Sequence, residues 1–250
     1  MLRYSLLVLF SCALCACDSQ PLIGPYGDQY GAGGVSGDGG GACRPGQAIL
    51  TGAVVNARDL GGTPLEAGGT VACGQLYRGA PLYSFSADAC ANFEALGIRT
   101  VIDLRTEDER LLKPDAACVG EVANVVSTPL PIPYNVSRAD YIADMDTKVS
   151  MLAALRLLAD PTAYPVYFHC TWGRDRTGVL SAVLLLALGA SQSAILREYM
   201  LSEPNVGAFP DSLVGVIEEI QRRGGIDSYL AATGVSDEEI AALRAQAIAP

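Results

Sequence analysis

One segment, residues 166–188, constrains the fold of this chain more than any other. Its first three residues, Val-Tyr-Phe, form a short run of large apolar side chains that is typical of a strand buried on both faces. Residues 178–188 are again almost wholly apolar, but this stretch is too short to span a bilayer and is typical of a buried core helix. A buried strand that leads through a short polar loop into a buried helix predicts a domain in which helices cover a sheet.

The rest of the globular part repeats this alternation. Residues 100–104, Thr-Val-Ile-Asp-Leu, predict a second buried strand. The pattern after Ser86 predicts a helix that turns Phe93 and Leu96 inward and ends at Gly97. Further helices are predicted over residues 148–158, 194–201, 212–221 and 237–245. Strands separated by helices predict an α/β domain with a central, mostly parallel sheet flanked by helices.

Composition and charge exclude several classes of function. The chain has 250 residues, half of them hydrophobic, so it can bury a sizeable core and is not disordered throughout. It carries 17 Lys and Arg against 27 Asp and Glu, a formal net charge of −10. This charge argues against a nucleic-acid partner, because a phosphate backbone requires a cationic face. His169 is the single histidine of the chain, which excludes a metal site built from several histidines.

The N-terminus has the features of an export signal. Arg3 precedes an apolar stretch over residues 4–14 that is too short to remain as a transmembrane helix. The Leu-Cys-Ala-Cys sequence that ends at Cys17 resembles the bacterial lipobox, in which a small residue precedes the cysteine that is lipidated and becomes the mature N-terminus. We therefore predict a lipoprotein signal peptide over residues 1–16 and lipidation of Cys17. Cys12 is a weaker candidate, and an ordinary cleaved signal peptide that releases the protein is the alternative.

A glycine-rich stretch follows the predicted anchor. Ten of the 29 residues from 18 to 46 are Gly, a composition typical of a tether that cannot bury enough surface to fold. We predict a lipidated cysteine and tether over residues 17–46 and a folded domain over residues 47–250. The predicted location is the bacterial cell envelope, with the protein anchored to a membrane through its lipid; release as a secreted protein is the alternative.

The polar loop after the first strand carries the chemistry. It reads His-Cys-Thr-Trp-Gly-Arg-Asp-Arg-Thr-Gly over residues 169–178. Its backbone N–H groups have no strand partner, so together with the helix N-terminus they form a concave site for an anion. The positive field there favours the thiolate of Cys170, which is the nucleophilic form. Arg176 can hold two phosphate oxygens with its planar guanidinium, and Gly173 permits a sharp backbone turn.

A His-Cys pair followed after five residues by Arg-Thr-Gly resembles the signature of the cysteine-dependent protein tyrosine phosphatases. The resemblance implies the fold of these enzymes. One alternative is a buried cysteine that happens to lie beside a helix start. A rhodanese-type sulfurtransferase also places a cysteine in an anion-binding loop, but it would not be expected to carry the Arg-Asp-Arg-Thr-Gly ending.

Three further motifs resemble a bacterial and fungal subfamily of atypical tyrosine phosphatases with a Lys-Asp-Arg loop. They are Asn-Ala-Arg-Asp-Leu-Gly-Gly at residues 56–62, Leu-Tyr-Arg-Gly-Ala at 76–80, and the stretch 97–105 followed by Glu109. The resemblance extends from about residue 51 to residue 244, nearly the whole globular part. The chain departs from the subfamily at Ala57, Gly79 and Arg174, where Phe, Ser and Lys are usual.

The resemblance implies a mechanism. Cys170 attacks phosphorus and forms a phosphocysteine, while Arg176 and the loop amides stabilise the charge on the phosphoryl oxygens. No metal or organic cofactor is expected. Asp175 is the favoured general acid, which protonates the leaving oxygen, and Asp103 is the second choice. The stretch before the loop offers three more carboxylates, Asp140, Asp144 and Asp146.

Other residues of the motifs have expected roles around this centre. The remaining loop residues are expected to contact the substrate: Thr171, Trp172, Gly173, Arg174 and Thr177. Five residues are expected to support the loop: His169, Asp103, Arg105, Arg58 and Asp59. For Asp103 with Arg105, and for Arg58 with Asp59, a purely structural ion-pair network is an equal alternative. The side chain of His169 is expected to point away from the anion site.

The predicted function is that of a phosphomonoester hydrolase, a protein tyrosine or dual-specificity phosphatase. Phosphoinositides or inositol phosphates are the alternative substrates. An inactive lipoprotein that binds phosphorylated ligands at the same loop is the alternative from a different class. The expected partners are therefore a phosphorylated protein or phosphoinositide and a membrane, with no nucleic acid and no metal.

The cysteines predict two disulfides. Past Cys17 the chain has five cysteines, an odd number, and the compartment is expected to be oxidising. Four of them can pair while Cys170 stays free as the nucleophile. Of the three possible connectivities we predict Cys43–Cys73 and Cys90–Cys118, because sequential pairing closes short loops.

Overall fold

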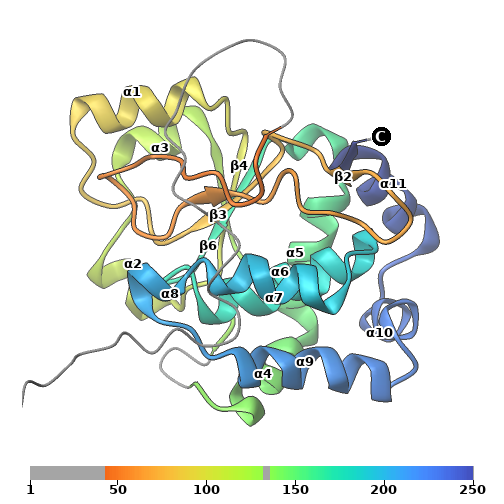
Figure 1. The fold of residues 1–250 in the computed structure, drawn as a ribbon. Coiled ribbons are helices and arrows are strands. Elements are labelled where there is room, and N and C mark those ends of the chain that lie inside the picture. The colour runs from red at the N-terminus through yellow and green to blue at the C-terminus, as the bar shows by residue number, and fades with distance from the viewer. Residues whose placement is uncertain (1–42, 132–135, 250) are drawn as a thin grey trace, which may run out of the picture. The chain divides into compact units, whose positions relative to one another are not determined.

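The domain is organised around a five-stranded sheet (Figure 1). The computed structural model describes residues 43–131 and 136–249. The predicted signal peptide, the tether up to residue 42, Cys12 and the lipidated Cys17 lie outside the described residues. The order of strands across the sheet is β1 (Arg58–Asp59), β3 (Leu76–Gly79), β6 (Val166–His169), β4 (Thr100–Asp103) and β5 (Asn124–Ser127).

Four neighbouring strands of this sheet are parallel, which confirms the predicted architecture. β3, β6, β4 and β5 run in one direction, and only the two-residue β1 pairs antiparallel with β3. β6 lies in the middle of the sheet, so its carboxyl end is flanked by those of β3 and β4. A separate two-stranded antiparallel sheet joins β2 (Thr70–Val71) to β7 (Ile248–Ala249).

Alternation along the strands builds two hydrophobic clusters. In β6, Tyr167 packs into one cluster while Val166 and Phe168 pack into the other. The Tyr167 side is covered by α1 (Ala87–Ala95) and α3 (Ala117–Val122) (Figure 1). The larger cluster is covered by α4 (Arg138–Met145), α5 (Lys148–Ala159), α6 (Asp175–Leu188), α7 (Gln192–Met200), α9 (Pro210–Arg222), α10 (Ile226–Thr233) and α11 (Asp237–Ala247). Because successive side chains of a strand point to opposite faces, a parallel sheet between two helical layers must be apolar on both.

Helix α6 is the buried core helix predicted after the loop. All fourteen of its residues are buried, and it ends at Gly189, which adopts the left-handed conformation at φ +89°. The helix begins at Asp175, three residues before the apolar run at 178–188. Its first turn is polar and yet buried, so the hydrophobic pattern alone did not reveal it. In the part of the chain that the structure describes, no helix has the length and apolar character needed to cross a bilayer.

The longer predicted elements are confirmed, whereas many short ones escaped the sequence pattern. Strands β4 and β6 and helices α1, α5, α7, α9 and α11 lie where they were expected, with ends that differ by a few residues. Six short helical segments were not predicted: α2 (Glu107–Leu112), α3, α4, the 3₁₀ turn Pro161–Ala163, α8 (Glu203–Val206) and α10. A segment of one or two turns is too short to show helical periodicity, so its hydrophobic pattern carries little information.

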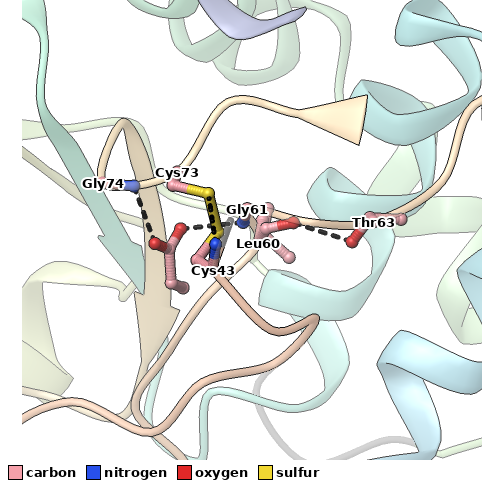
Figure 2. Close-up of a disulfide and its surroundings, with 7 residues drawn as sticks. Cys43, Leu60, Gly61, Thr63, Cys73 and Gly74 are labelled. Atoms are coloured by element: carbon pink, nitrogen blue, oxygen red, sulfur yellow. Dashed lines mark hydrogen bonds between the residues drawn. A yellow bond between two sulfur atoms is a disulfide. The ribbon is translucent and has the colours of Figure 1, made fainter. Parts of the chain in front are cut away.

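Both predicted disulfides are present. Cys43 pairs with Cys73 (Figure 2), and Cys90 of α1 pairs with Cys118 of α3. The first bond explains a glycine of the Asn-Ala-Arg-Asp-Leu-Gly-Gly motif, because a Cβ on Gly61 would lie 2.7 Å from the Cys43 sulfur and 2.6 Å from Cys73 Cα. The pairing ties the start of the described chain to the domain. Cys170 is free, as predicted.

Candidate active site

The loop that follows β6 stands at the carboxyl end of the central strand. Residues 170–174 connect His169, the last residue of β6, to Asp175, the first residue of α6. Gly173 makes this path possible: its φ is +63°, and a Cβ there would lie 2.3 Å from the carbonyl carbon of Gly79. No other residue would fit against the end of β3. The backbone amides of the loop therefore lie at the N-terminus of a fourteen-residue buried helix, which is the positive end of its dipole.

The peptide groups of this loop are held by their carbonyls. The side-chain amide of Asn56 donates to the Trp172 and Gly173 oxygens at 3.2 and 3.0 Å, and Arg78 Nη2 donates to the Gly173 oxygen at 2.7 Å. Among the described residues, none accepts a hydrogen bond from the backbone N–H groups of residues 171–176. Since a trans peptide points its C=O and N–H in opposite directions, tethering the carbonyls outside leaves the amides free on the inner side. Free amides at a helix N-terminus make an anion site.

Cys170 occupies this anion site. It is the free cysteine of the described chain and is 1% exposed. Thr177, in the first turn of α6, is fully buried, and its hydroxyl has no hydrogen-bond partner among the described residues. The structure thus brings the Cys170 thiol, unpaired amides and an unpaired hydroxyl to one helix terminus. The role of Cys170 as nucleophile stays a prediction.

Arg176 is aimed by a glutamate on α2. Its Nη1 and Nη2 donate to the two carboxylate oxygens of Glu109 at 2.7 Å each, and Nη2 also donates to Thr171 Oγ1 at 3.2 Å. Burial acts to raise the pKa of Glu109, but hydrogen bonds from Arg176, Thr171 and Thr106 outweigh it and lower that pKa to about 2. Glu109 in turn holds the pKa of the Arg176 guanidinium above its ordinary value despite its burial. The Arg176 guanidinium is therefore charged and held in a fixed orientation at the loop.

Asp175 lies at the start of α6, in contact with α4. Its carboxylate accepts hydrogen bonds from the Tyr141 hydroxyl at 2.5 Å and from Arg174 Nε at 2.9 Å. The Tyr141 hydroxyl lies 2.8 Å from that of Tyr199, and the Arg174 guanidinium stacks 4.4 Å from the centre of the Phe209 ring. Asp175 is thus present at the site in a network of donors. Its role as general acid stays a prediction.

The three alternative acids before the loop are in different surroundings. Asp140 caps the first turn of α4 by accepting from Ser137, and Asp146 is exposed and pairs with Arg223. Asp144 is 2% exposed, and its charge is among the influences that raise the pKa of Arg176. Of the three, the structure brings Asp144 into the electrostatic neighbourhood of the loop.

Asp103 forms a buried ion pair beneath the loop. Its carboxylate accepts from Arg105 Nε at 3.0 and 3.1 Å and from Nη2 at 2.7 Å. His169 is fully buried beside them, with Nδ1 3.9 Å from Asp103 and Nε2 3.3 Å from Asp115. Asp103, Asp115 and His169 are close enough together to hold a metal ion, but Arg105 Nη2 already lies 2.7 and 3.1 Å from the two carboxylates. The geometry is that of an ion-pair network.

The structure separates Arg58 from Asp59, so the ion pair considered for these two residues is not formed, because neighbours on a strand point to opposite faces. Asp59 accepts from the amides of Gly61 and Gly74 at 2.8 and 2.7 Å. Both glycines lie beside the Cys43–Cys73 disulfide (Figure 2), so Asp59 is held there and not at the loop. Burial raises its pKa, and the two amides oppose this effect. Arg58 points the other way, to Glu198 of α7, with its Nε 2.6 Å from Oε1. Burial lowers the pKa of Arg58 to about 10.

A cavity of about 360 Å³ opens beside the loop. Thr171 and Trp172 line it together with Tyr83 and Val55, and the last three of these are among the exposed large hydrophobic residues of the described chain. Trp172 is 50% exposed. The predicted substrate-contacting residues Thr171 and Trp172 therefore form one wall of a partly apolar recess.

Several residues of the site were missed or undervalued from the sequence. Glu109, Arg78 and Asn56 were noticed only as parts of motifs, whereas Tyr141 and Glu198 were not considered. Each contacts the loop or a residue that holds the loop, from a position 34 to 140 residues away in the chain. A buried acidic residue inside an amphipathic helix, as Glu198 is in α7, is the one local sign that could have been followed.

The parallel sheet carries one free cysteine into a loop of unpaired amides. An arginine held by Glu109 follows six residues later. This fold is that of the cysteine-dependent phosphatases. The profile described as "Tyrosine phosphatase family" matches residues 50–249. The chain therefore belongs to the tyrosine phosphatase family.

Two curated relatives agree with this membership. A Cupriavidus necator protein, provisionally named a tyrosine-protein phosphatase, is 29% identical over an alignment of 175 residues, and the match covers 62% of this chain and 63% of that protein. A tyrosine-protein phosphatase of Nostoc commune is 24% identical over an alignment of 196 residues, and the match covers 60% of this chain and 66% of that protein. The chain thus spans slightly less than two thirds of the length of either relative.

Solved structures are similar at a lower level. The crystal structure of P. aeruginosa TpbA has a TM-score of 0.43 and 24% identity, covering 64% of this chain and 86% of that one. The core catalytic domain of the S. cerevisiae PP-IP phosphatase SIW14 has a TM-score of 0.40 and 18% identity, covering 62% of this chain and 89% of that one.

Proposed function

We propose that this protein is a phosphomonoester hydrolase that works through a phosphocysteine intermediate. One observation carries the proposal: the free, buried Cys170 lies in a loop whose amides donate to no described residue, next to an arginine held in place by Glu109. An anion-binding loop does not need a nucleophile, and a structural cysteine does not need unpaired amides. Membership of the tyrosine phosphatase family supports the same conclusion.

The proposed reaction has two steps. In the first, the Cys170 thiolate forms a bond to phosphorus while the bond from phosphorus to the leaving oxygen breaks, and a carboxylic acid gives that oxygen a proton. In the second, a water oxygen attacks phosphorus, the sulfur–phosphorus bond breaks, and the carboxylate takes the proton of the water. The loop amides and Arg176 stabilise the charge on the equatorial oxygens in both steps.

For the substrate we propose a phosphorylated side chain of a protein, phosphotyrosine or a phosphorylated hydroxyl. The recess beside Trp172 and Tyr83 supports this choice, because aromatic walls next to a phosphate site suit the ring of an aryl phosphate. A phosphoinositide is the second candidate, since the predicted lipid anchor would hold the site near a membrane.

Hydrolysis of p-nitrophenyl phosphate by the purified protein tests the activity. We expect phosphate release that is abolished in Cys170→Ser. A wild type that binds inorganic phosphate without releasing any from the ester would identify the inactive phosphate-binding lipoprotein instead. A panel of phosphopeptides and of inositol lipids in vesicles would then decide the substrate class.

We further propose that the protein is a lipoprotein of the bacterial cell envelope, anchored through Cys17. The lipobox-like sequence and the glycine-rich stretch after it support this proposal. Cys17→Ser should shift the protein from the membrane fraction to the soluble fraction, because the acylated residue carries the membrane affinity. If Cys12→Ser causes this shift and Cys17→Ser does not, the cleavage site lies at Cys12.

A further inference from the structure

A buried cluster of charges lies behind the phosphate loop. Arg58 and Arg78 are 3% and 0% exposed, and both pair with the single carboxylate of Glu198, which is 5% exposed. The distances are 2.6 Å from Arg58 Nε and 2.7 Å from Arg78 Nη1. Within this cluster two guanidinium groups face one carboxylate, so one positive charge is left over. Burying an uncompensated charge is costly, so we expect a negative charge outside the cluster to offset it.

The first arm of the cluster reaches the loop through Arg78. Its Nη1 donates to Glu198 Oε2 and its Nη2 to the Gly173 oxygen, both at 2.7 Å. A guanidinium is planar and rigid, so anchoring one nitrogen on Glu198 fixes the direction of the other. Arg78 thereby sets the position of the Gly173 carbonyl.

The second arm reaches the same carbonyl through Asn56. Arg58 Nη1 donates to the side-chain oxygen of Asn56, and Asn56 Nδ2 donates to the Gly173 oxygen at 3.0 Å. Asn56 has a φ of +59°, a left-handed conformation that asparagine tolerates better than most residues. Glu198 thus controls the Gly173 oxygen along two routes, one through each arginine.

Fixing this oxygen also fixes an amide on the other side of the peptide. The Gly173 carbonyl and the Arg174 N–H belong to one trans peptide, so they point in opposite directions. The oxygen is held on the cluster side, and the Arg174 N–H has no acceptor among the described residues. The direction of this N–H, one of the donors to the phosphate, therefore depends on the cluster.

We propose that Arg78 and Glu198 are positioning residues for the phosphate loop: they aim its amides at the bound oxyanion and place an excess positive charge behind it. This inference rests on the proposed phosphatase function. The dianionic phosphoryl group supplies the negative charge that the cluster lacks. The cluster would therefore contribute to oxyanion binding and to transition-state stabilisation without touching the substrate.

Arg78→Lys tests the inference, because it keeps the charge and removes the rigid fork. A matched control is Arg244→Lys: Arg244 Nε also donates to a backbone carbonyl, that of Ala187 at 2.8 Å, but near the other end of α6. We expect Arg78→Lys to lower kcat on p-nitrophenyl phosphate by about 10²-fold, the effect of a displacement of about 1 Å in a catalytic group. The inhibition constant of inorganic phosphate should rise in parallel, with KM changed less than kcat. Arg244→Lys should leave all three constants within about twofold of the wild type.

A second variant covers the case in which Arg78→Lys does not fold. Asn56→Asp keeps the acceptor for Arg58 and the tolerance for positive φ, but it removes both N–H donors to the loop. It should weaken phosphate binding, as Arg78→Lys does, in a variant whose cooperative thermal unfolding shows that it is folded. Unchanged kcat and unchanged phosphate affinity in a folded Arg78→Lys or Asn56→Asp variant would overturn the inference, as would equal losses in Arg244→Lys. If the wild type hydrolyses no ester, phosphate binding measured by calorimetry still tests the positioning role, so the two failures can be told apart.

Discussion

Two glutamates hold arginines at the Cys170 loop, and they do so for different ends. Glu109 is partly exposed and binds Arg176 in a one-to-one pair, with the Arg176 Nε donating to no described residue. Glu198 is buried and binds two arginines, each of which also donates to the loop or to the residue that holds it. The comparison shows that a buried Arg–Glu pair does not by itself identify a catalytic arginine. What distinguishes the two sites is where the arginine lies: Arg176 belongs to the segment that follows Cys170, whereas Arg58 and Arg78 come from β1 and β3 and donate to oxygens of Asn56 and Gly173.

Among the arginines around the loop, the largest effect is expected when the guanidinium of Arg176 is replaced. Arg176→Lys keeps the charge paired with Glu109 but loses the bidentate geometry, and kcat/KM on p-nitrophenyl phosphate should fall on the order of 10³-fold, the lower end for an arginine that stabilises a transferring phosphoryl group. The loss should exceed that of Arg78→Lys, because Arg176 would touch the phosphoryl oxygens. Equal losses in the two variants would erase the distinction between the two glutamate sites.

The general acid is expected on the side of the loop that faces α4. Asp175→Asn should change kcat little with p-nitrophenyl phosphate, whose leaving group departs readily. With alkyl phosphates it should lower kcat on the order of 10²–10⁴-fold, the size of a general-acid contribution. Steady-state rates on the two substrate classes measure this difference directly.

Two matched variants show which other carboxylate could be the acid. Asp103→Asn should lower kcat by the same factor on both substrate classes, since Asp103 is paired with Arg105. A loss that depends on the leaving group in Asp144→Asn but not in Asp175→Asn would move the acid to α4.

Lowering the pH should remove the stabilisation of the folded state that Glu109 provides, within a defined pH range. The pKa of Glu109 is about 2 in the folded protein, below its ordinary value of 4.5, so the folded state binds fewer protons than the unfolded state. The stabilisation that Glu109 provides is therefore present above about pH 4.5 and lost as the pH falls toward 2. The difference in unfolding free energy between wild type and Glu109→Gln, measured in urea, should shrink across that window. A difference that stays constant from pH 6 to pH 2 would mean that the charge of Glu109 stabilises nothing.

The smallest effect is expected at the mouth of the recess. Trp172 is half-exposed, so Trp172→Ala should change the unfolding free energy by no more than about 0.5 kcal/mol. Loss of an aromatic contact worth about 0.5–1.5 kcal/mol should raise KM for aryl phosphates roughly 2- to 12-fold, with little change for alkyl phosphates. A rise in KM that is equal for both classes would argue against stacking on the substrate ring.

Much of this protein follows from local patterns in its chain. The apolar runs at residues 100–104 and 166–168 predict the two buried strands, and the loop between a buried strand and a buried helix predicts an anion site with Cys170 inside it. These inferences succeed because strand burial, helix periodicity and the free amides of a helix N-terminus are properties of consecutive residues. The disulfide pairing was also predicted, since sequential pairing closes short loops and leaves Cys170 as the odd cysteine.

The side chains that orient the peptide groups of the loop could not be predicted in this way. Glu109, Tyr141 and Glu198 reach the loop or its anchors from three different helices, and nothing in their neighbouring residues indicates which buried partner each will meet. Asp59 shows the same limit from the other side, because it stands next to Arg58 in the motif and yet points to the disulfide. The sequence by itself determined which cysteine stays free, the sheet that carries it and the buried helix that follows it. Only the tertiary structure decided which side chains hold the loop carbonyls and arginines, because those contacts depend on the packing of whole helices against the sheet.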